Sequence, residues 1–359
     1  MKTLRIFITF LFLSFYCYPS PSIDYDDYIK TSPQKGYETK KSKAEKLFLE
    51  RKYPEAIETY IKVLEEEEID DSKIIRKVAQ SYSAINQVDN SVEYIERYLY
   101  SDFNTDVLAD SWFDHIRQTP QFETITEKYT PKFSIWSFMY LYVALIGFYI
   151  AFILHFNRKV DRPAKILISS FIFIHSFFIL HICLNITNYQ YKFPHSYLMS
   201  TCFSFLYGPL LYFYFKRITQ QYSFKKRDLL HLIPTVLFLI YIFPIYTLPA
   251  DEKLTLMLDR VTNGLNPGDS PDVAILVILK LISLVVYGYF LRKLYLASKK
   301  HKENINRENR IWQRNIYFIH IAYIACYVGY GILISNNVIS GFLYHSQVVC
   351  MALMVMYIG

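Results

Sequence analysis

The sequence has little glycine, little cysteine and few charged residues. Its 359 residues include 10 Gly and 5 Cys, and charged residues make up only 20% of the chain, against about 25% in an average globular protein. The low glycine content excludes a collagen-like repeat, and the hydrophobic content of 52% excludes a disordered chain. Five cysteines over this length also exclude a disulfide-stapled mini-domain.

The cysteines form no motif. All of them lie in apolar runs, none with a C-x-x-C neighbour: Cys17, Cys183, Cys202, Cys326 and Cys350. This spacing indicates neither a zinc site nor a disulfide framework, and we interpret these residues as small apolar side chains of helices. No nucleophile–base pair or His-based metal motif occurs either. We therefore predict no catalytic residues, no metal site and no cofactor, and expect that the chain is not an enzyme.

The N-terminus has the pattern of an export signal. Lys2 and Arg5 precede an apolar run at 6–18, which ends in Tyr-Pro-Ser-Pro-Ser. Residues 1–22 are therefore predicted to be a signal peptide. No A-x-A cleavage motif is present, so an uncleaved anchor is the alternative.

Charge separates the rest of the chain into two domains. Residues 23–132 carry 16 Lys and Arg against 23 Asp and Glu, whereas residues 133–359 carry 21 against 9. The overall charge of +7 is the difference between an acidic domain and a basic one. It is therefore no indication by itself of nucleic-acid binding.

The acidic domain, 23–132, contains a helical repeat with a period near 35 residues. A small residue, a large one and an apolar one recur on one predicted helix face: Ala56, Tyr60 and Val63, then Ser91, Ile95 and Tyr98. The pattern resembles tetratricopeptide repeats, in which Ala56 and Ser91 would let paired helices approach closely. A capping element is expected at 107–128. Such repeats form concave surfaces that hold peptides, so we expect a periplasmic peptide or protein partner. The alternative is a purely structural cap.

The basic domain is predicted to be seven membrane-spanning helices in the lipid bilayer, which makes the whole chain all-α. The apolar runs lie at 133–156, 164–186, 197–215, 229–248, 273–291, 315–334 and 342–358. One set of connecting loops carries 17 Lys and Arg and the opposite set carries 3. The positive-inside rule places the basic loops in the cytoplasm. We therefore predict a multi-pass protein of the bacterial inner membrane, with the repeats in the periplasm and the C-terminus in the cytoplasm.

One charge lies deep in the predicted spans. Lys280 is about seven residues from the outer end of the fifth run, and the seven runs contain no Asp or Glu. An intramembrane lysine is costly, so it must face the bundle interior. Its candidate partners are His175, His181, His320, a tyrosine or a ligand anion, and we predict a ligand-binding site at these residues. A structural hydrogen bond or a snorkelling side chain is the alternative.

Two proline-containing segments are candidate hinges. Gly208 and Pro209 interrupt the third run, where we expect a kink. His231 and Pro234 lie at the entry of the fourth run, and Pro234 falls in the first helical turns, where a missing N–H does little harm.

These two segments carry a family resemblance. Residues 205–216 read FLYGPLLYFYFK and residues 224–234 read FKKRDLLHLIP. They resemble the membrane region of AraC-type transcriptional regulators of Bacteroidetes-like bacteria, with a GPLLYxYxK stretch before a K-x-x-LLHxIP entry. The resemblance covers residues 133–359. It implies a cytoplasmic helix-turn-helix domain after the last span, a dimeric full-length form, and DNA contact only through that domain. The chain ends inside the last apolar run, and we expect it to be truncated before that domain.

We accordingly interpret the chain as the transmembrane sensor or receptor module of a one-component transcription regulator. It would relay a periplasmic or membrane signal to the DNA-binding domain. The alternative is a membrane-anchored repeat scaffold that recruits an envelope partner. A passive channel or carrier is the third hypothesis.

Overall fold

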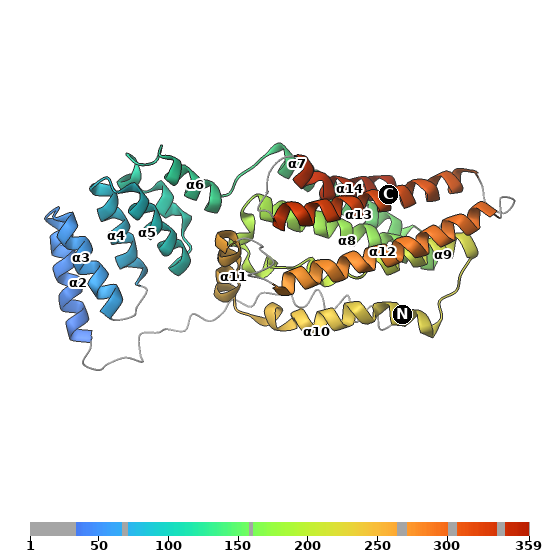
Figure 1. Ribbon diagram of the computed structural model, residues 1–359, viewed down its shortest axis with the longest axis horizontal. Coiled ribbons are helices and arrows are strands. Elements are labelled where there is room, and N and C mark those ends of the chain that lie inside the picture. Colours follow the sequence, from blue (N-terminus) through green and yellow to red (C-terminus); the bar gives the residue numbers. More distant parts are fainter. Residues whose placement is uncertain are drawn as a thin grey trace. The chain divides into compact units, whose positions relative to one another are not determined.

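The computed structural model describes residues 34–66, 71–157, 161–263, 271–300, 307–335 and 342–358, and all regular structure in these ranges is helical (Figure 1). The predicted signal peptide, 1–22, lies outside the described residues. The chain divides into two compact units. The first comprises Met1–Asp102 with Ala109–Ile116, and the second comprises Phe103–Leu108 with Arg117–Gly359.

The first unit is a series of antiparallel helix pairs. Its α-helices are α2 (Gln34–Leu49), α3 (Tyr53–Glu66), α4 (Ser72–Ala84) and α5 (Val88–Ser101). Each helix packs on the next along the chain. Ala56 and Ser91 are fully buried, and the Ser91 hydroxyl donates to the carbonyl of Ala79 on the neighbouring helix, at 3.0 Å. Tyr60 and Tyr98 are also buried.

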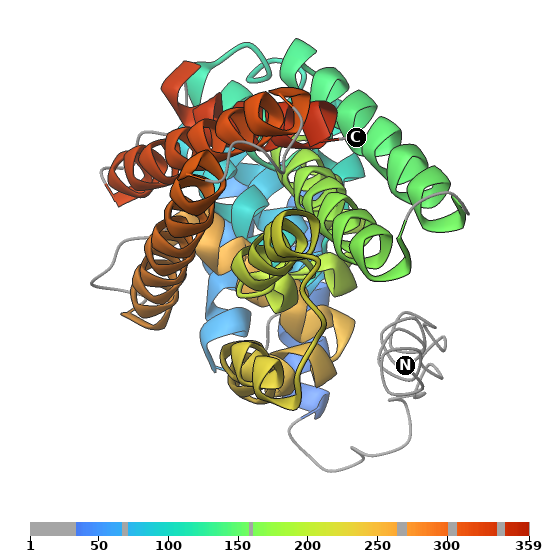
Figure 2. The same cartoon turned by 90° about the vertical axis from the view of Figure 1, so that its right-hand side faces the viewer.

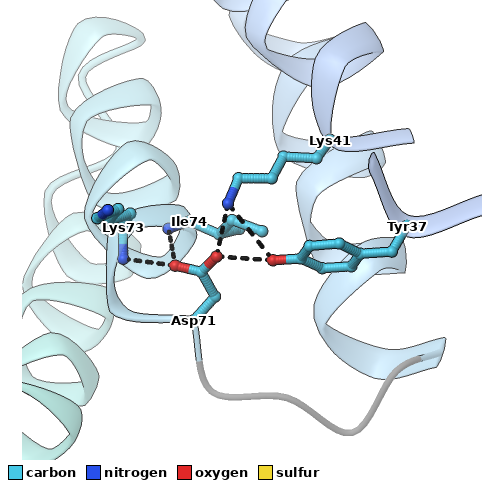
Figure 3. A network of polar contacts seen from close by, with 5 residues as sticks. All are labelled: Tyr37, Lys41, Asp71, Lys73 and Ile74. Atoms are coloured by element: carbon cyan, nitrogen blue, oxygen red, sulfur yellow. Dashed lines mark hydrogen bonds and ion pairs between the residues drawn. The ribbon is translucent and has the colours of Figure 1, made fainter. Parts of the chain in front are cut away.

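An N-cap network fixes the start of α4 (Figure 3). Asp71 Oδ1 accepts from the backbone N–H groups of Lys73 and Ile74, which satisfies two donors that the first helical turn leaves free. Asp71 Oδ2 accepts from the hydroxyl of Tyr37 at 2.6 Å and from Lys41 Nζ at 2.8 Å, both on α2. One carboxylate thus caps one helix and ties it to another.

The second unit contains nine α-helices within the described ranges. They are α6 (Pro120–Tyr129), α7 (Ile135–Phe156), α8 (Arg162–Ile186), α9 (Tyr207–Gln220), α10 (Ile233–Thr247), α11 (Ala250–Asn263), α12 (Pro271–Lys300), α13 (Arg307–Ser335) and α14 (Phe342–Ile358). Asn188, after α8, donates through Nδ2 to the carbonyls of Glu127 and Thr130 at the end of α6. The structure therefore groups α6 with the apolar helices.

Six helical segments in the described part of the chain are long and apolar enough to cross a bilayer of about 30 Å. They are Ile135–Phe156, Arg162–Ile186, Pro194–Gln220, Lys226–Thr247, Ile275–Ser298 and Arg310–Leu333. The chain is therefore a multi-pass membrane protein. The seventh predicted span corresponds to α14, which is apolar but has only 17 residues.

The bundle core forms where α7, α8, α9, α12, α13 and α14 meet (Figure 2). Two thirds of the apolar window of α8 (67%) is buried, against 17% for the segment that contains α10. Several large apolar residues of α10 are exposed, as expected of a helix that faces lipid: Val236, Leu237, Ile240, Tyr241 and Phe243.

The third predicted span differs from expectation. It is α-helical only from Tyr207, and the residues before it form 3₁₀ helices at Pro194–Ser196 and Thr201–Phe203 with turns between them. Leu198 has φ of 54° in this stretch, a left-handed conformation that no α-helix accommodates. Pro209 thus stands in the first turn of α9, where its missing N–H has no helical acceptor to lose. The expected kink at Gly208 and Pro209 is instead a helix start.

The segment 249–272, expected to be a loop between two spans, contains α11. Met257 and Leu258 are buried on one face of this helix. Lys253 is also buried, and its ammonium group bonds to the carbonyl of Tyr246 at 2.9 Å and to His195 Nδ1 at 3.0 Å. Partners of this kind make a buried lysine tolerable.

Candidate ligand site in the helix bundle

Lys280 projects from α12 toward two aromatic rings. Its Nζ atom lies 4.8 Å from the ring centroid of Phe178 on α8 and 5.0 Å from that of Tyr327 on α13. Cation–π contacts of this length are favourable. The ammonium group therefore lies between helices.

No hydrogen bond or ion pair reaches Lys280 from the described residues. An ammonium group has three donors, and removing them from water without an acceptor is costly. The two rings offset part of this cost but accept no conventional hydrogen bond. Among the described residues, this cation thus has no anionic partner, whereas buried Lys253 has two acceptors.

Two turns before Tyr327 on α13, His320 pairs with Tyr207 and so connects α13 to α9. The Tyr207 hydroxyl lies 2.8 Å from His320 Nδ1, and His320 Nε2 lies 3.2 Å from the carbonyl of Leu284 on α12. A carbonyl only accepts, so Nε2 carries the proton and Tyr207 donates to Nδ1. The Tyr207 ring also stacks on Tyr323, with centroids 5.4 Å apart. Three helices are joined here through one neutral imidazole.

His175 lies against the same group. Its Nδ1 bonds to the carbonyl of Phe171 at 2.8 Å, and its ring centroid is 4.9 Å from that of Tyr207. It interacts electrostatically with both Lys280 and His320. Because Phe171 fixes the proton on Nδ1, the free lone pair of the His175 ring is on Nε2.

His181 does not join this cluster. Its Nδ1 bonds to the hydroxyl of Ser200 at 2.6 Å, in the irregular stretch before α9. Of the residues predicted for the ligand site, the structure therefore brings together Lys280, His175 and His320, and places His181 elsewhere with a partner of its own.

Two predicted hinge residues meet at a tyrosine that the sequence did not single out. Tyr287 on α12 bonds through its hydroxyl to His231 Nδ1 at 2.6 Å. Its ring lies so close to Gly208 that a β-carbon there would overlap it. Gly208 thus provides close packing between α9 and α12. Pro234 stands in the first turn of α10, as predicted.

Sequence reasoning missed the aromatic partners of the site. Phe178, Tyr207, Tyr323 and Tyr327 occupy helical positions like many others in a chain with 33 Tyr and 28 Phe. Their one usable signal is spacing, because Tyr323 and Tyr327 follow His320 by three and seven residues and so share its helix face.

The cluster has the chemistry of a binding site. It contains one cation, two imidazoles and several hydroxyls, and no carboxylate among the described residues that form it. Within the described ranges, no group of His, Cys, Asp and Glu could hold a metal ion. The arrangement is suited to an anion that Lys280 attracts.

No protein-family model, curated protein or solved structure matches this chain.

Proposed function

We propose that the chain is the sensory part of a membrane-bound, one-component transcription regulator of the AraC type. In this proposal the repeats lie in the periplasm and α14 completes seven spans. The last span leads to a cytoplasmic helix-turn-helix domain beyond residue 359, which binds DNA as a dimer. The resemblance of residues 205–216 and 224–234 supports the family, and the 17-to-3 distribution of basic residues between the loops supports the orientation.

The observation that carries the sensory role is that no anion pairs with Lys280 among the described residues. This lysine lies between α8, α12 and α13, and a ligand that pairs with it would bring these helices together. A ligand that binds one arrangement of the helices better than another shifts their populations. Tyr287 extends this coupling, because it joins α12 to both α9 and the entry of α10.

A reporter assay tests this proposal. The whole chain, fused after Ile358 to an AraC-type DNA-binding domain, drives a reporter gene in bacteria. Lys280→Met should abolish the response to signal while membrane levels of the protein stay unchanged. Lys293→Met, a matched loss of an exposed lysine on the same helix, should respond normally. An unaltered response of Lys280→Met would contradict the proposal.

Reporter fusions at the C-terminus test the span count separately. With seven spans, green fluorescent protein fused after Ile358 is cytoplasmic and fluoresces, while alkaline phosphatase at the same position is inactive. The opposite pair of results would show that α14 does not cross the membrane.

A scaffold is the second candidate, favoured by the surface of the first unit. Trp112 is partly exposed beside an open hollow lined by Ala84, Ser111 and His115, and stacked repeats commonly present such surfaces to peptides. Deleting residues 23–132 discriminates between the two roles. Loss of partner recruitment with a retained transcription response would assign the repeats to a scaffold.

A further inference from the structure

A lysine–histidine pair holds α11, the helix between the fourth and fifth apolar segments. Lys253 on α11 is only 3% exposed, and its Nζ atom lies 3.0 Å from Nδ1 of His195 and 2.9 Å from the carbonyl oxygen of Tyr246. An ammonium group only donates hydrogen bonds, so Nδ1 of His195 accepts and the imidazole proton is on Nε2. The pair therefore requires a neutral imidazole.

His195 is accessible to protons from water, whereas Lys253 is buried. The His195 side chain is exposed in the 3₁₀ helix Pro194–Ser196, on which α11 packs. A histidine in water takes up a proton near about pH 6.5. A protonated His195 has two N–H groups and no acceptor, and it places a second positive charge beside the ammonium group. Even if the charged ring turns into water, buried Lys253 loses one acceptor.

The other charged side chains around this pair have different surroundings. Arg260 of α11 and Lys192 lie over tyrosine rings, 5.1 Å and 5.7 Å from the ring centroids. The carboxylates of α11 are exposed on its surface: Asp251, Glu252 and Asp259. Among the described residues, Lys253 is the charged group that interacts electrostatically with His195. Protonation of His195 therefore acts on α11 through Lys253.

The stretch that carries His195 also contacts two apolar helices. The hydroxyl of Ser200 lies 2.6 Å from Nδ1 of His181 on α8. The hydroxyl of Tyr246, at the end of α10, donates to the carbonyl of Leu198 at 2.9 Å. A change in the packing of α11 on this stretch is therefore passed to α8 and α10.

We propose that His195 and Lys253 form an acid-sensitive latch for α11. The neutral imidazole holds the buried ammonium group, and protonation of His195 loosens α11 from the stretch 194–203. In the orientation of the proposed function this end of the bundle faces the periplasm, so the pH of that compartment would set the state of the latch. The latch itself follows from the contacts of His195 and Lys253 and does not depend on the proposed function.

Hydrogen exchange of the purified whole chain in detergent tests the latch. The protection factors of α11 amides, which correct exchange for its intrinsic pH dependence, should fall about tenfold in the wild type when a bond from a charged donor is lost, between about pH 7.5 and about pH 5.5. His195→Gln should abolish this fall, because its amide oxygen accepts from Lys253 but does not titrate. His195→Ala should lower the protection at both pH values, since it offers no acceptor.

A matched control is His155→Gln. His155 is also an exposed histidine, at the end of α7 with its ring against Phe156, and its replacement should leave the acid response of α11 unchanged. Lys253→Met should remove the response, and His195→Gln keeps the test decisive should Lys253→Met fail to fold. Constant protection of α11 in the wild type, or an equal acid response in His195→Gln and the wild type, would overturn the inference. Because no reporter gene is involved, this result is independent of the transcription assay.

Discussion

The hydroxyl of Tyr287 bonds to Nδ1 of His231 at 2.6 Å, so that α12 is tied to the segment that leads into α10. The ring of the same tyrosine lies on Gly208 at the start of α9. One side chain thus connects the two segments whose sequences carry the family resemblance.

Replacing Gly208 by Ala should destabilise the bundle. The added β-carbon would overlap the Tyr287 ring, and overpacking of this kind costs about 1–3 kcal/mol. Thermal unfolding in detergent measures the change. Gly329→Ala is the matched control, because a β-carbon there meets nothing within 4 Å, and it should be neutral or slightly stabilising. Equal effects of the two substitutions would contradict the packing role of Gly208.

Replacing Tyr207 by Phe should also destabilise the bundle. It leaves Nδ1 of the fully buried His320 without its donor, and a buried acceptor without a partner costs about 1–3 kcal/mol. Tyr241→Phe is the control, because the Tyr241 side chain is 59% exposed on α10 and its change should stay within about 0.5 kcal/mol. A Tyr207→Phe protein as stable as the control would show that the bond to His320 contributes nothing measurable.

Cys326 and Cys350 should form a disulfide on oxidation. Their Sγ atoms lie 3.4 Å apart between α13 and α14, whereas the thiols of Cys183 and Cys202 donate to the carbonyls of Ser137 and Met199. Copper–phenanthroline would take two electrons as the two thiols lose their protons. Mass spectrometry should find one cross-linked peptide pair, and none in Cys326→Ser. Recovery of both Cys326 and Cys350 in alkylated form after oxidation would refute the contact.

Acid should weaken the link between α2 and α4. Burial raises the pKa of the Asp71 carboxyl, but the hydrogen bonds from Lys41 and Tyr37 outweigh burial and leave this pKa below its usual value. The pKa of Tyr37 is raised to about 12 by burial and by its hydrogen bond to Asp71. A lowered carboxyl pKa stabilises the fold above its unfolded value of about 3.9, and this stability is lost as the pH falls through the folded pKa. The protection factors of α4 amides in the whole chain, which correct exchange for its intrinsic pH dependence, should therefore fall in acid.

Asp71→Asn separates the charge from the helix cap. Asparagine retains the cap acceptor but not the ion pair with Lys41, so we expect a loss of about 1–2 kcal/mol at neutral pH and a flatter acid dependence. Glu58→Gln is the control, because its pair with Lys62 is well exposed and such pairs contribute little. An unchanged acid dependence in Asp71→Asn would exclude Asp71 as its source.

Much of the architecture follows from local features of the sequence. Six of the seven predicted spans correspond to helices long and apolar enough to cross a membrane, because length and hydropathy are local quantities. Pro234 falls in a first helical turn for the equally local reason that proline lacks an N–H. The small residues Ala56 and Ser91 are buried in adjacent helix pairs.

Other features depend on contacts that no local pattern contains. The irregular stretch before Tyr207 lies in a run as apolar as its neighbours, and it is tolerated where protein covers its backbone groups. Lys280 was identifiable because a charge in an apolar run is costly wherever it packs. The rings that surround Lys280 were not identifiable from the sequence, since Phe178 on α8 and Tyr327 on α13 are brought to it only by helix packing. The sequence alone thus determined the apolar helices and the presence of a cation within one of them, because these follow from length, hydropathy and charge. Only the tertiary structure decided that His175 and His320 share its site and that His181 does not, because contacts between distant residues arise when helices pack.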